Sequence, residues 1–435
     1  MKVAFYTLGC KVNQYETQIL KQYFSADGFD IVDDKDSADV YVVNSCTVTA
    51  TGDKKTRQLL HRFKRQNPFA VLALTGCMPQ AFPEDAQVLS DADVITGAYN
   101  RKGLLSAVKK SMASGERVVD ITKHHRGEDF EDMYATEFLE KTRAFVKIQD
   151  GCERYCSYCI IPTARGAFRS KKLDEIKKEI TELANKGFKE VVLVGINLSC
   201  YGIEYGLGLI DAVKAACAVD GVERVRLGSL EPELLELDYI MELSRLKKFC
   251  PQFHLSLQSG SDRTLKRMNR HYTTTEYSEI VDNIRKVFDN PAITTDIMVG
   301  FPGETNEEFE QTINYIKELK LSKAHVFAYS RRKGTKAALM PEQIDNKIKV
   351  KRSKMLIEIT DAAHNEFLKS QIGKTVNVLV ETVKNGILKG YSENYTPVEI
   401  LVFEEMDNNI LSPNVIQSAI ITDVGKTCCI GKLVL

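Results

Sequence analysis

The stretch that decides how this chain is interpreted is Gly151-Cys152-Glu153-Arg154-Tyr155-Cys156-Ser157-Tyr158-Cys159. Its three cysteines, which we call the loop cysteines, have the spacing CxxxCxxC. Three thiolates can hold three irons of a 4Fe-4S cluster and leave the fourth iron open to another ligand. A structural zinc site is the alternative, but it usually takes four nitrogen or sulfur ligands, and no fourth ligand stands at a matching spacing. The stretch therefore predicts an iron-sulfur site.

The sequence around this loop alternates short apolar runs with runs of helical period. We expect strands at 144–148, 191–194, 224–227, 253–257, 293–299 and 324–328, with helices at 173–186, 275–288 and 306–319. This alternation over residues 142–340 predicts a parallel, partial β/α barrel of six units. In such barrels the chemistry lies at the C-terminal rim of the strands.

Residues 1–121 show a second α/β pattern, typical of a doubly wound parallel sheet, with strands expected at 3–7, 40–44, 71–75 and 94–96. Cys10, Cys46 and Cys77, which we call the strand-end cysteines, each follow one of these strands. Parallel strands end along one edge of the sheet, where open α/β folds bind ligands. A cysteine beside a core strand can equally be a small buried hydrophobe, so the pattern leaves both interpretations open.

Three further segments complete the expected organisation of this α/β chain. Residues 122–141 are charged, with Glu128, Asp129, Glu131 and Asp132, and are interpreted as a linker. Residues 341–368 are expected to form one long helix within a connecting segment, 341–371. Residues 372–435 alternate valine, isoleucine and threonine with polar residues, which predicts a small C-terminal β-barrel.

Composition narrows the class of protein. The chain has 435 residues, 43% hydrophobic and 27% charged, and no apolar run near the roughly 18 residues of a membrane span. The N-terminus enters a strand pattern directly, without a secretory signal, which predicts a cytoplasmic protein. In that setting eleven cysteines favour metal ligands over disulfides. Because 59 basic residues balance 59 acidic ones, any nucleic-acid surface must be local.

The loop, together with the following Ile160-Ile161-Pro162-Thr163-Ala164-Arg165-Gly166, resembles the radical S-adenosylmethionine (SAM) superfamily. Four rim segments resemble its methylthiotransferase branch: Gly195-Ile196-Asn197, Ser229-Leu230-Glu231-Pro232, Gln258-Ser259-Gly260-Ser261 and Gly300-Phe301-Pro302-Gly303-Glu304-Thr305. The resemblance implies that SAM binds the open iron and that an external one-electron reductant drives its cleavage to a 5'-deoxyadenosyl radical. It also implies a SAM pocket lined by Ser229, Glu231, Gln258, Ser259 and Asp296.

The segments around the strand-end cysteines closely resemble the N-terminal methylthiotransferase domain. That resemblance implies that Cys10, Cys46 and Cys77 bind an auxiliary 4Fe-4S cluster, giving two clusters per chain. Residues 372–435 resemble TRAM modules, which are associated with RNA binding. Tyr391 and Tyr395 in this region either stack on nucleotides or belong to the barrel core.

The segment Leu8-Gly9-Cys10-Lys11-Val12-Asn13 resembles the threonylcarbamoyladenosine branch, whereas the isopentenyladenosine branch typically carries glutamine and methionine at positions 11 and 12. The expected reaction is insertion of a methylthio group at carbon 2 of N6-threonylcarbamoyladenosine at tRNA position 37, in the anticodon stem-loop, by a monomer. The alternatives are isopentenyladenosine tRNA, a ribosomal-protein aspartate, and a noncatalytic iron-sulfur RNA-binding protein.

Two basic stretches are candidates for RNA contacts. One comprises Lys54, Lys55, Arg57, Arg62, Lys64 and Arg65, and the other comprises Arg165, Arg169, Lys171 and Lys172. The first is expected to be the solvated face of a helix. The second lies near the loop cysteines and is expected to be the better candidate for guiding a polyanion.

Overall fold

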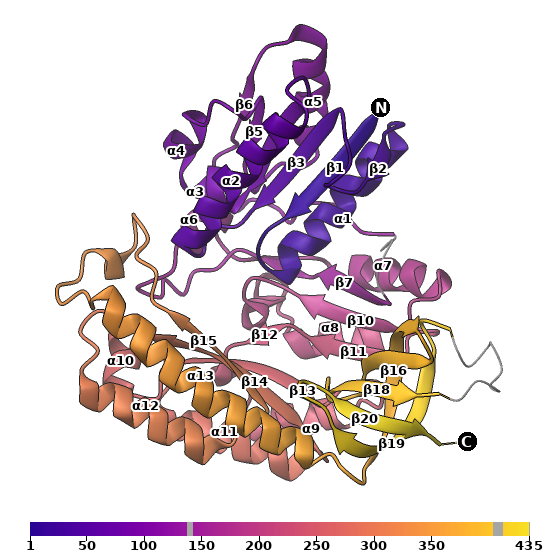
Figure 1. The fold of residues 1–435 in the computed structure, drawn as a ribbon, viewed down its shortest axis with the longest axis vertical. Coiled ribbons are helices and arrows are strands. Elements are labelled where there is room, and N and C mark those ends of the chain that lie inside the picture. The colour runs from indigo at the N-terminus through magenta and orange to yellow at the C-terminus, as the bar shows by residue number, and fades with distance from the viewer. Residues whose placement is uncertain (137–141, 403–411, 435) are drawn as a thin grey trace.

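The computed structural model describes residues 1–136, 142–402 and 412–434. Its N-terminal unit is a six-stranded parallel sheet in the order β2-β1-β3-β4-β5-β6 (Figure 1). The strands are β1 (Lys2–Thr7), β2 (Asp30–Val32), β3 (Val40–Ser45), β4 (Val71–Gly76), β5 (Val94–Thr96) and β6 (Val118–Asp120). The four expected strands are confirmed, and β2 and β6, each three residues long, are additional edge strands that short apolar runs did not reveal.

Helices cover both faces of this sheet, as the doubly wound class requires. They are α1 (Lys11–Ala26), α2 (Ala50–Gln66), α3 (Cys77–Ala81), α4 (Pro83–Gln87) and α5 (Gly103–Ser114). On one face, Phe63 of α2 packs against Tyr41 of β3, and on the other, Phe24 of α1 and Leu104 of α5 pack against Val40. The sheet is therefore buried on both sides, which is why its strands read as continuous apolar runs.

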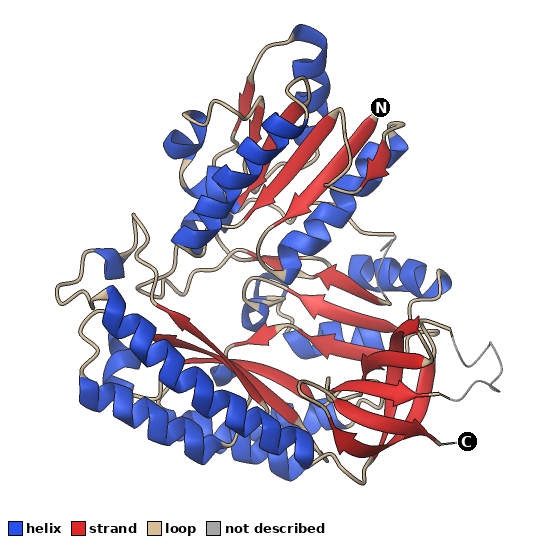
Figure 2. Cartoon of the chain, viewed as in Figure 1, coloured by secondary structure: helices blue, strands red, loops and turns tan. Residues whose placement is uncertain are grey.

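The central unit contains all six expected strands in parallel, and the predicted β/α arrangement is confirmed. They are β7 (Arg143–Lys147), β10 (Glu190–Val194), β11 (Arg224–Leu227), β13 (Gln252–Gln258), β14 (Ala292–Val299) and β15 (Lys323–Ala328). The flanking helices are α7 (Leu173–Asn185), α8 (Leu209–Cys217), α9 (Leu237–Ser244), α10 (Asp262–Arg267), α11 (Thr274–Val287) and α12 (Asn306–Leu319). Figure 2 shows them on the outer side of the strands.

The barrel is split into two sheets, β11-β10-β7 and β12-β13-β14-β15. The split falls within one run of chain, because β11 pairs with β10 and, after Gly228, the short strand β12 (Ser229–Leu230) pairs with β13. A parallel bridge between Val225 and Phe249 still joins the two halves. The change of partner at Gly228 directs the residues that follow it toward the rim.

The long connecting helix, α13 (Asn346–Lys369), begins five residues later than expected. Asp345 caps it by accepting a hydrogen bond from the Lys347 backbone amide at 2.7 Å, which fixes its first turn. A closed five-stranded barrel follows, confirming the predicted C-terminal fold. Its strands are β16 (Thr375–Lys384), β17 (Ile387–Tyr391), β18 (Pro397–Leu401), β19 (Ile416–Val424) and β20 (Cys429–Leu433).

The segment expected to be a solvated linker is anchored to both neighbouring units. Residues 122–136 contain no helix or strand, yet Glu128 is buried and pairs with Arg169 at 2.9 Å, and Glu131 pairs with Arg101 at 2.6 Å. Met133 is buried in the core of the central unit. Glu128 and Glu131 are therefore partners for buried cations, whereas Asp129 and Asp132 are exposed. Residues 137–141 lie outside the described part of the chain. No helix among the described residues has both the length and the apolar character needed to cross a membrane.

Candidate iron-sulfur and substrate site

The strand-end cysteines lie at one edge of the N-terminal sheet because β1, β3 and β4 are adjacent and parallel. Cys10 precedes α1, Cys46 follows β3, and Cys77 is the first residue of α3. Gly9 makes the close approach possible: it has φ of +106°, and a side-chain carbon there would lie 2.8 Å from Cys46 Cβ. The sheet thus gathers three thiols from segments far apart in sequence.

Asn13 holds the first two of these loops together. Its Nδ2 donates hydrogen bonds to the backbone carbonyls of Leu8 at 2.7 Å and Ser45 at 3.0 Å. The Cys10 thiol also donates a long hydrogen bond, 3.8 Å, to Asn13 Oδ1. One buried amide therefore fixes the loop before Cys10 against the strand end before Cys46.

The loop cysteines occupy the chain between two short paired strands, β8 (Gln149–Asp150) and β9 (Arg169–Ser170). Gly151 has φ of +73°, and a side-chain carbon there would lie 1.8 Å from the Ala167 carbonyl oxygen, so the turn accepts only glycine. The Cys152 amide donates to the Gly166 carbonyl at 3.1 Å, and the Ser157 amide donates to the Met268 carbonyl at 2.9 Å. These bonds shape the loop without using the thiols.

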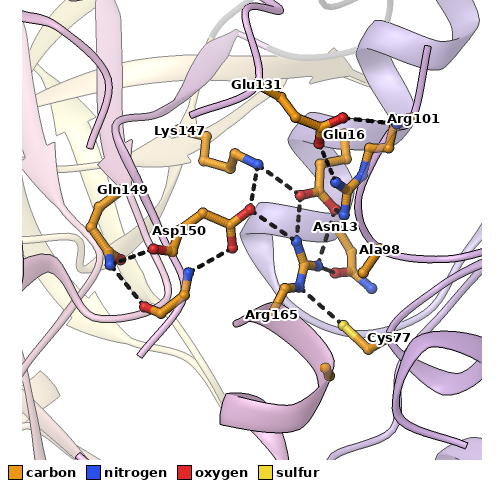
Figure 3. Close-up of polar contacts among 12 residues, drawn as sticks. Asn13, Glu16, Cys77, Ala98, Arg101, Glu131, Lys147, Gln149, Asp150 and Arg165 are labelled. Carbon is orange, nitrogen blue, oxygen red and sulfur yellow. Dashed lines mark hydrogen bonds and ion pairs between the residues drawn. The ribbon is translucent and has the colours of Figure 1, made fainter. Parts of the chain in front are cut away.

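Five buried side chains and the partly buried Glu131, which together we call the interdomain charge cluster, connect the N-terminal unit with the segments before and after the loop cysteines (Figure 3). They are Glu16, Arg101, Glu131, Lys147, Asp150 and Arg165. Glu16 Oε1 accepts from Lys147 Nζ at 3.0 Å and from Arg165 Nη1 at 2.5 Å, and Arg101 pairs with Glu16 at 2.9 Å. Three cations thus face three carboxylates at the junction of the N-terminal and central units.

Arg165 carries the link from this cluster to the thiols. Its Nε lies 3.2 Å from Cys77 Sγ, and its Nη2 donates to Asn13 Oδ1 at 2.7 Å. At the other end, Asp150 accepts from Lys147 at 2.9 Å and from the Gly151 amide at 2.9 Å, directly before the first loop cysteine. The same set of charges therefore orients both cysteine-bearing segments.

The donor chemistry fits iron-sulfur ligation. Burial raises the pKa of Cys77 to about 12 against the opposing charge of Arg165, and burial raises the pKa of Cys159 to about 12 as well. Cys77 and Cys159 without metal therefore keep their protons, which metal binding must displace. Among the described residues, no three histidine, cysteine, aspartate or glutamate side chains are grouped closely enough to hold a metal ion, and this applies to both cysteine sets.

Two buried polar atoms near the strand ends have no hydrogen-bond partner among the described residues, namely Asn197 Oδ1 and Gln258 Oε1. Asn197 Nδ2 lies 3.8 Å from Cys152 Sγ, and Gln258, with φ of +68°, ends β13. A buried polar atom without a partner is costly. Both atoms therefore fit a site that a polar cofactor completes.

The residues expected to line a SAM pocket lie in or directly after three neighbouring strands, β12, β13 and β14. Glu231 pairs with Arg270, whose Nη1 lies 3.3 Å from Cys156 Sγ, so Glu231 lies beside the loop cysteines. Ser229 is exposed in β12. The Ser259 hydroxyl is buried and lies 3.5 Å from Thr312 Oγ1, which places it toward α12.

Asp296, the fifth expected pocket residue, lies within β14 and forms an ion pair with His254 at 3.4 Å. The sequence interpretation missed Arg270 and Asn197, which contact loop-cysteine sulfurs. Asn197 stands in the rim segment Gly195-Ile196-Asn197, which could have identified it. Arg270 lies in no recognisable pattern.

Two expectations about RNA contacts are affected by burial. Arg165, Arg169 and Lys171 are buried in ion pairs, so the second basic stretch is not a surface for a polyanion. Tyr391 and Tyr395 stack on each other at 4.6 Å, and Arg143 of the central unit lies over both rings. These tyrosines contribute to docking of the C-terminal barrel on the central unit.

A cavity of about 790 Å³, which we call the barrel cavity, lies between β13, β14 and β15 and the C-terminal barrel. His254, Thr294 and His325 line it from the strands, and Tyr395 lines it from the C-terminal barrel. Lys11, the residue after Cys10, reaches it from the N-terminal unit. All three units therefore contribute to one cavity, and the N-terminal unit does so through the residue that follows Cys10.

Comparisons with known proteins agree with this architecture. A family model described as "Radical SAM superfamily" matches residues 146–316, and one described as "Uncharacterized protein family UPF0004" matches residues 2–97. The solved structure of the radical SAM methyltransferase TsrM from Kitasatospora setae resembles the fold with a TM-score of 0.54 and 12% identity, covering 76% of this chain and 72% of that one. The structure of the cobalamin-dependent S-adenosylmethionine radical enzyme OxsB resembles it with a TM-score of 0.52 and 11% identity, covering 82% of this chain and 56% of that one.

Curated relatives match almost the whole chain. Threonylcarbamoyladenosine tRNA methylthiotransferase MtaB of Bacillus subtilis (strain 168) is 37% identical, covering 96% of this chain and 94% of the relative. The protein of that name from Aquifex aeolicus (strain VF5) is 37% identical, covering 93% and 98%. The tRNA-2-methylthio-N(6)-dimethylallyladenosine synthase of Pelotomaculum thermopropionicum (strain DSM 13744 / JCM 10971 / SI) is 33% identical, covering 88% and 87%. With such identity over nearly its full length, the chain belongs to the radical SAM methylthiotransferase family.

Proposed function

We propose that this protein inserts a methylthio group at carbon 2 of N6-threonylcarbamoyladenosine at tRNA position 37, beside the anticodon. Three relatives that carry this activity in their names are 36–37% identical and a fourth is 33% identical, whereas those named for the dimethylallyladenosine reaction are 32–34% identical. The Lys11-Val12 pair supports the same branch. Dimethylallyladenosine tRNA is the second candidate substrate.

One observation carries the proposal that the two cysteine sets act together. Arg165 contacts Cys77 Sγ at 3.2 Å, and the next residue, Gly166, accepts a hydrogen bond from the Cys152 amide at 3.1 Å. Two consecutive residues thus touch a member of each set. A substrate placed at this junction would face both sets at once, which a transfer of sulfur to a carbon centre requires.

We assign a 4Fe-4S cluster to the loop cysteines Cys152, Cys156 and Cys159, and a second, auxiliary cluster to the strand-end cysteines Cys10, Cys46 and Cys77. When bound, the clusters and SAM supply the radical chemistry and the methyl and sulfur atoms that a carbon-hydrogen bond of adenine otherwise resists. The chain's own residues position these groups. Asn197 and Gln258 would meet polar atoms of SAM through oxygens that have no partner among the described residues.

The proposed division of the chain has three domains: an N-terminal methylthiotransferase domain (1–121), a radical SAM domain (142–340) and a TRAM-like RNA-binding domain (372–435). A linker (122–141) and a connecting helix (341–371) join them. We propose that the protein works in the cytoplasm as a monomer. Its partners are SAM, the tRNA anticodon stem-loop and an external one-electron reductant. The half-buried tyrosine pair, Tyr391 and Tyr395, limits where the last domain can meet RNA, because that face is already docked on the central unit.

The test is nucleoside mass spectrometry after anaerobic reaction of the reconstituted protein with matched tRNAs. The tRNAs carry threonylcarbamoyladenosine, isopentenyladenosine or unmodified adenosine at position 37. We expect a mass increase for methylthio insertion on the first substrate, and none with a variant in which all three loop cysteines are alanine. Preferential reaction of isopentenyladenosine would refute the substrate assignment. Reaction of none, together with modification of a ribosomal-protein aspartate, would favour the sister activity, and absence of SAM cleavage would favour a noncatalytic protein.

A further inference from the structure

We propose that the barrel cavity receives the carboxylate-bearing arm of the target nucleoside and that the Lys11 ammonium is its anion-binding group. This inference rests on the proposed function and names the residue that selects its substrate. It assigns to the cavity a ligand class, an N6-linked amino-acid carboxylate.

Lys11 stands where such an arm would end. It follows Cys10 directly, so its backbone lies one residue, about 3.8 Å, from that of a strand-end cysteine. Carbon 2 and carbon 6 of adenine flank N1 on the same edge of the ring. A nucleoside that presents carbon 2 to the junction of the cysteine sets therefore carries its N6 arm alongside them, within reach of a neighbouring long side chain.

The Lys11 ammonium has no partner of its own. Its side chain is exposed to solvent and lines the barrel cavity, and it makes no ion pair or hydrogen bond with another described residue. Arg165 and Lys147, the nearby cations of the interdomain charge cluster, are by contrast matched to carboxylates. An unmatched ammonium in a partly enclosed space favours an anionic ligand.

The charges around Lys11 increase this preference. Burial and the positive charges of Arg143 and Arg226 lower the pKa of Lys11, and the carboxylate that opposes them is Glu190. Glu190 is already shared among guanidinium groups: Arg226 lies 2.8 Å from it, and Arg143 and Arg224 lie 3.7 Å and 3.6 Å away. Glu381, which also lines the cavity, pairs with Arg143 at 2.5 Å. Two carboxylates therefore face four cations here, namely Lys11, Arg143, Arg224 and Arg226, which leaves an excess of positive charge.

The opposite wall offers polar groups suited to the rest of the arm. His325 of β15 lines the same cavity as Lys11. Thr294 lines the same wall. A threonylcarbamoyl arm carries a carboxylate, a hydroxyl and a urea-like linkage, all of which need hydrogen-bond partners when buried. An isopentenyl arm has none of these and would leave Lys11 and its polar neighbours unsatisfied.

The test measures binding rather than turnover. A fluorescent anticodon stem-loop is titrated with the full-length, reconstituted protein. Three stem-loops are compared, whose adenosine at position 37 carries the threonylcarbamoyl acid, the neutral methyl ester of that acid, or no substituent. We expect the wild type to bind the acid about tenfold to a hundredfold more tightly than the ester, the range of a charge-assisted hydrogen bond. Lys11→Met should bind acid and ester alike, and Lys11→Arg should retain part of the preference.

The control is Lys21→Met, which removes a lysine from the same helix at a position away from the cavity and should behave as the wild type. Iron content reports whether Lys11→Met still holds its clusters. If Lys11→Met loses its clusters, the test rests on the ratio of the affinities for acid and ester, measured for the wild type and for Lys11→Arg. A wild type without preference for the acid, or a cluster-loaded Lys11→Met that keeps it, would overturn the inference. Methylthio transfer to threonylcarbamoyladenosine by the wild type would still uphold the proposed function in that case, whereas transfer only to isopentenyladenosine would refute the proposed function itself.

Discussion

Replacing Glu16 by glutamine removes one negative charge from the interdomain charge cluster and keeps the shape of the side chain. The carboxylate is fully buried and faces Arg101, Lys147 and Arg165. After the change, three buried cations share the remaining carboxylates Glu131 and Asp150. Breaking a buried ionic network from one side costs about 3–5 kcal/mol, because the partners keep their charge without compensation.

The titration of Glu16 gives a second measure of the same energy. Burial by itself would raise the pKa of Glu16, but Arg101, Arg165 and Lys147 outweigh burial and lower it from 4.5 to about 2. A carboxyl with a lowered pKa stabilises the folded state fully above pH 4.5, and this contribution is lost as the pH falls toward 2. The shift corresponds to about 3 kcal/mol, which agrees with the first value.

The measurement is urea unfolding of wild type and Glu16→Gln, followed by circular dichroism. At pH 7 the free energy of unfolding of the variant should be lower by about 3–5 kcal/mol. At pH 4 the difference should narrow by about 1 kcal/mol, because Glu16 in the unfolded wild type then begins to take up protons. Glu310→Gln, an exposed glutamate of α12, is the control and should change little. A Glu16 variant indistinguishable from this control, or a difference that widens at pH 4, would refute the reasoning.

Three further outcomes follow from the site. Alanine at all three loop cysteines should remove about half the iron, since each cubane holds about four irons. The same change should abolish SAM cleavage, measured as 5'-deoxyadenosine formed, and continued cleavage would contradict the ligand assignment. Alanine at all three strand-end cysteines should retain some SAM cleavage and lose methylthio transfer, so a methylthiolated product would rule out an auxiliary cluster there. Affinity for tRNA should fall linearly with salt on logarithmic axes in a filter-binding series, and a flat response would exclude phosphate contacts as the source of binding.

The helices and strands were predictable from sequence wherever the apolar residues recurred with one clear spacing. Each strand of the central unit carries at least one apolar face and falls between helices of clear 3.6 period, and all six expected strands are confirmed. The start of α13 was predicted five residues early because the charged residues after position 341 suit a helix or a loop equally. Asp345 decides the boundary through a cap that only the structure reveals.

The thiols of the site were predictable because each cysteine set lies in a local motif or at a strand end. The charges that orient them were not. Arg165 and Glu16 are 149 residues apart, and Lys147 and Glu16 are 131 residues apart, so no local pattern marks them as partners. Lys171 likewise seemed suited to RNA because its own segment is basic, whereas its partner Glu179 buries it.

The burial of matched charges at the junction bears on how the two cysteine sets are held. A buried ionic network adds little stability over apolar packing, but it tolerates few alternative arrangements because each charge must keep its partner. An apolar junction could slide, whereas this one fixes Arg165 simultaneously on Cys77, Asn13 and Glu16. Positional accuracy between the two sets is what a reaction involving both would need. Lys11, a cation of the same region, forms no ion pair with a carboxylate of the described residues. Its positive charge therefore remains available where the substrate is proposed to bind.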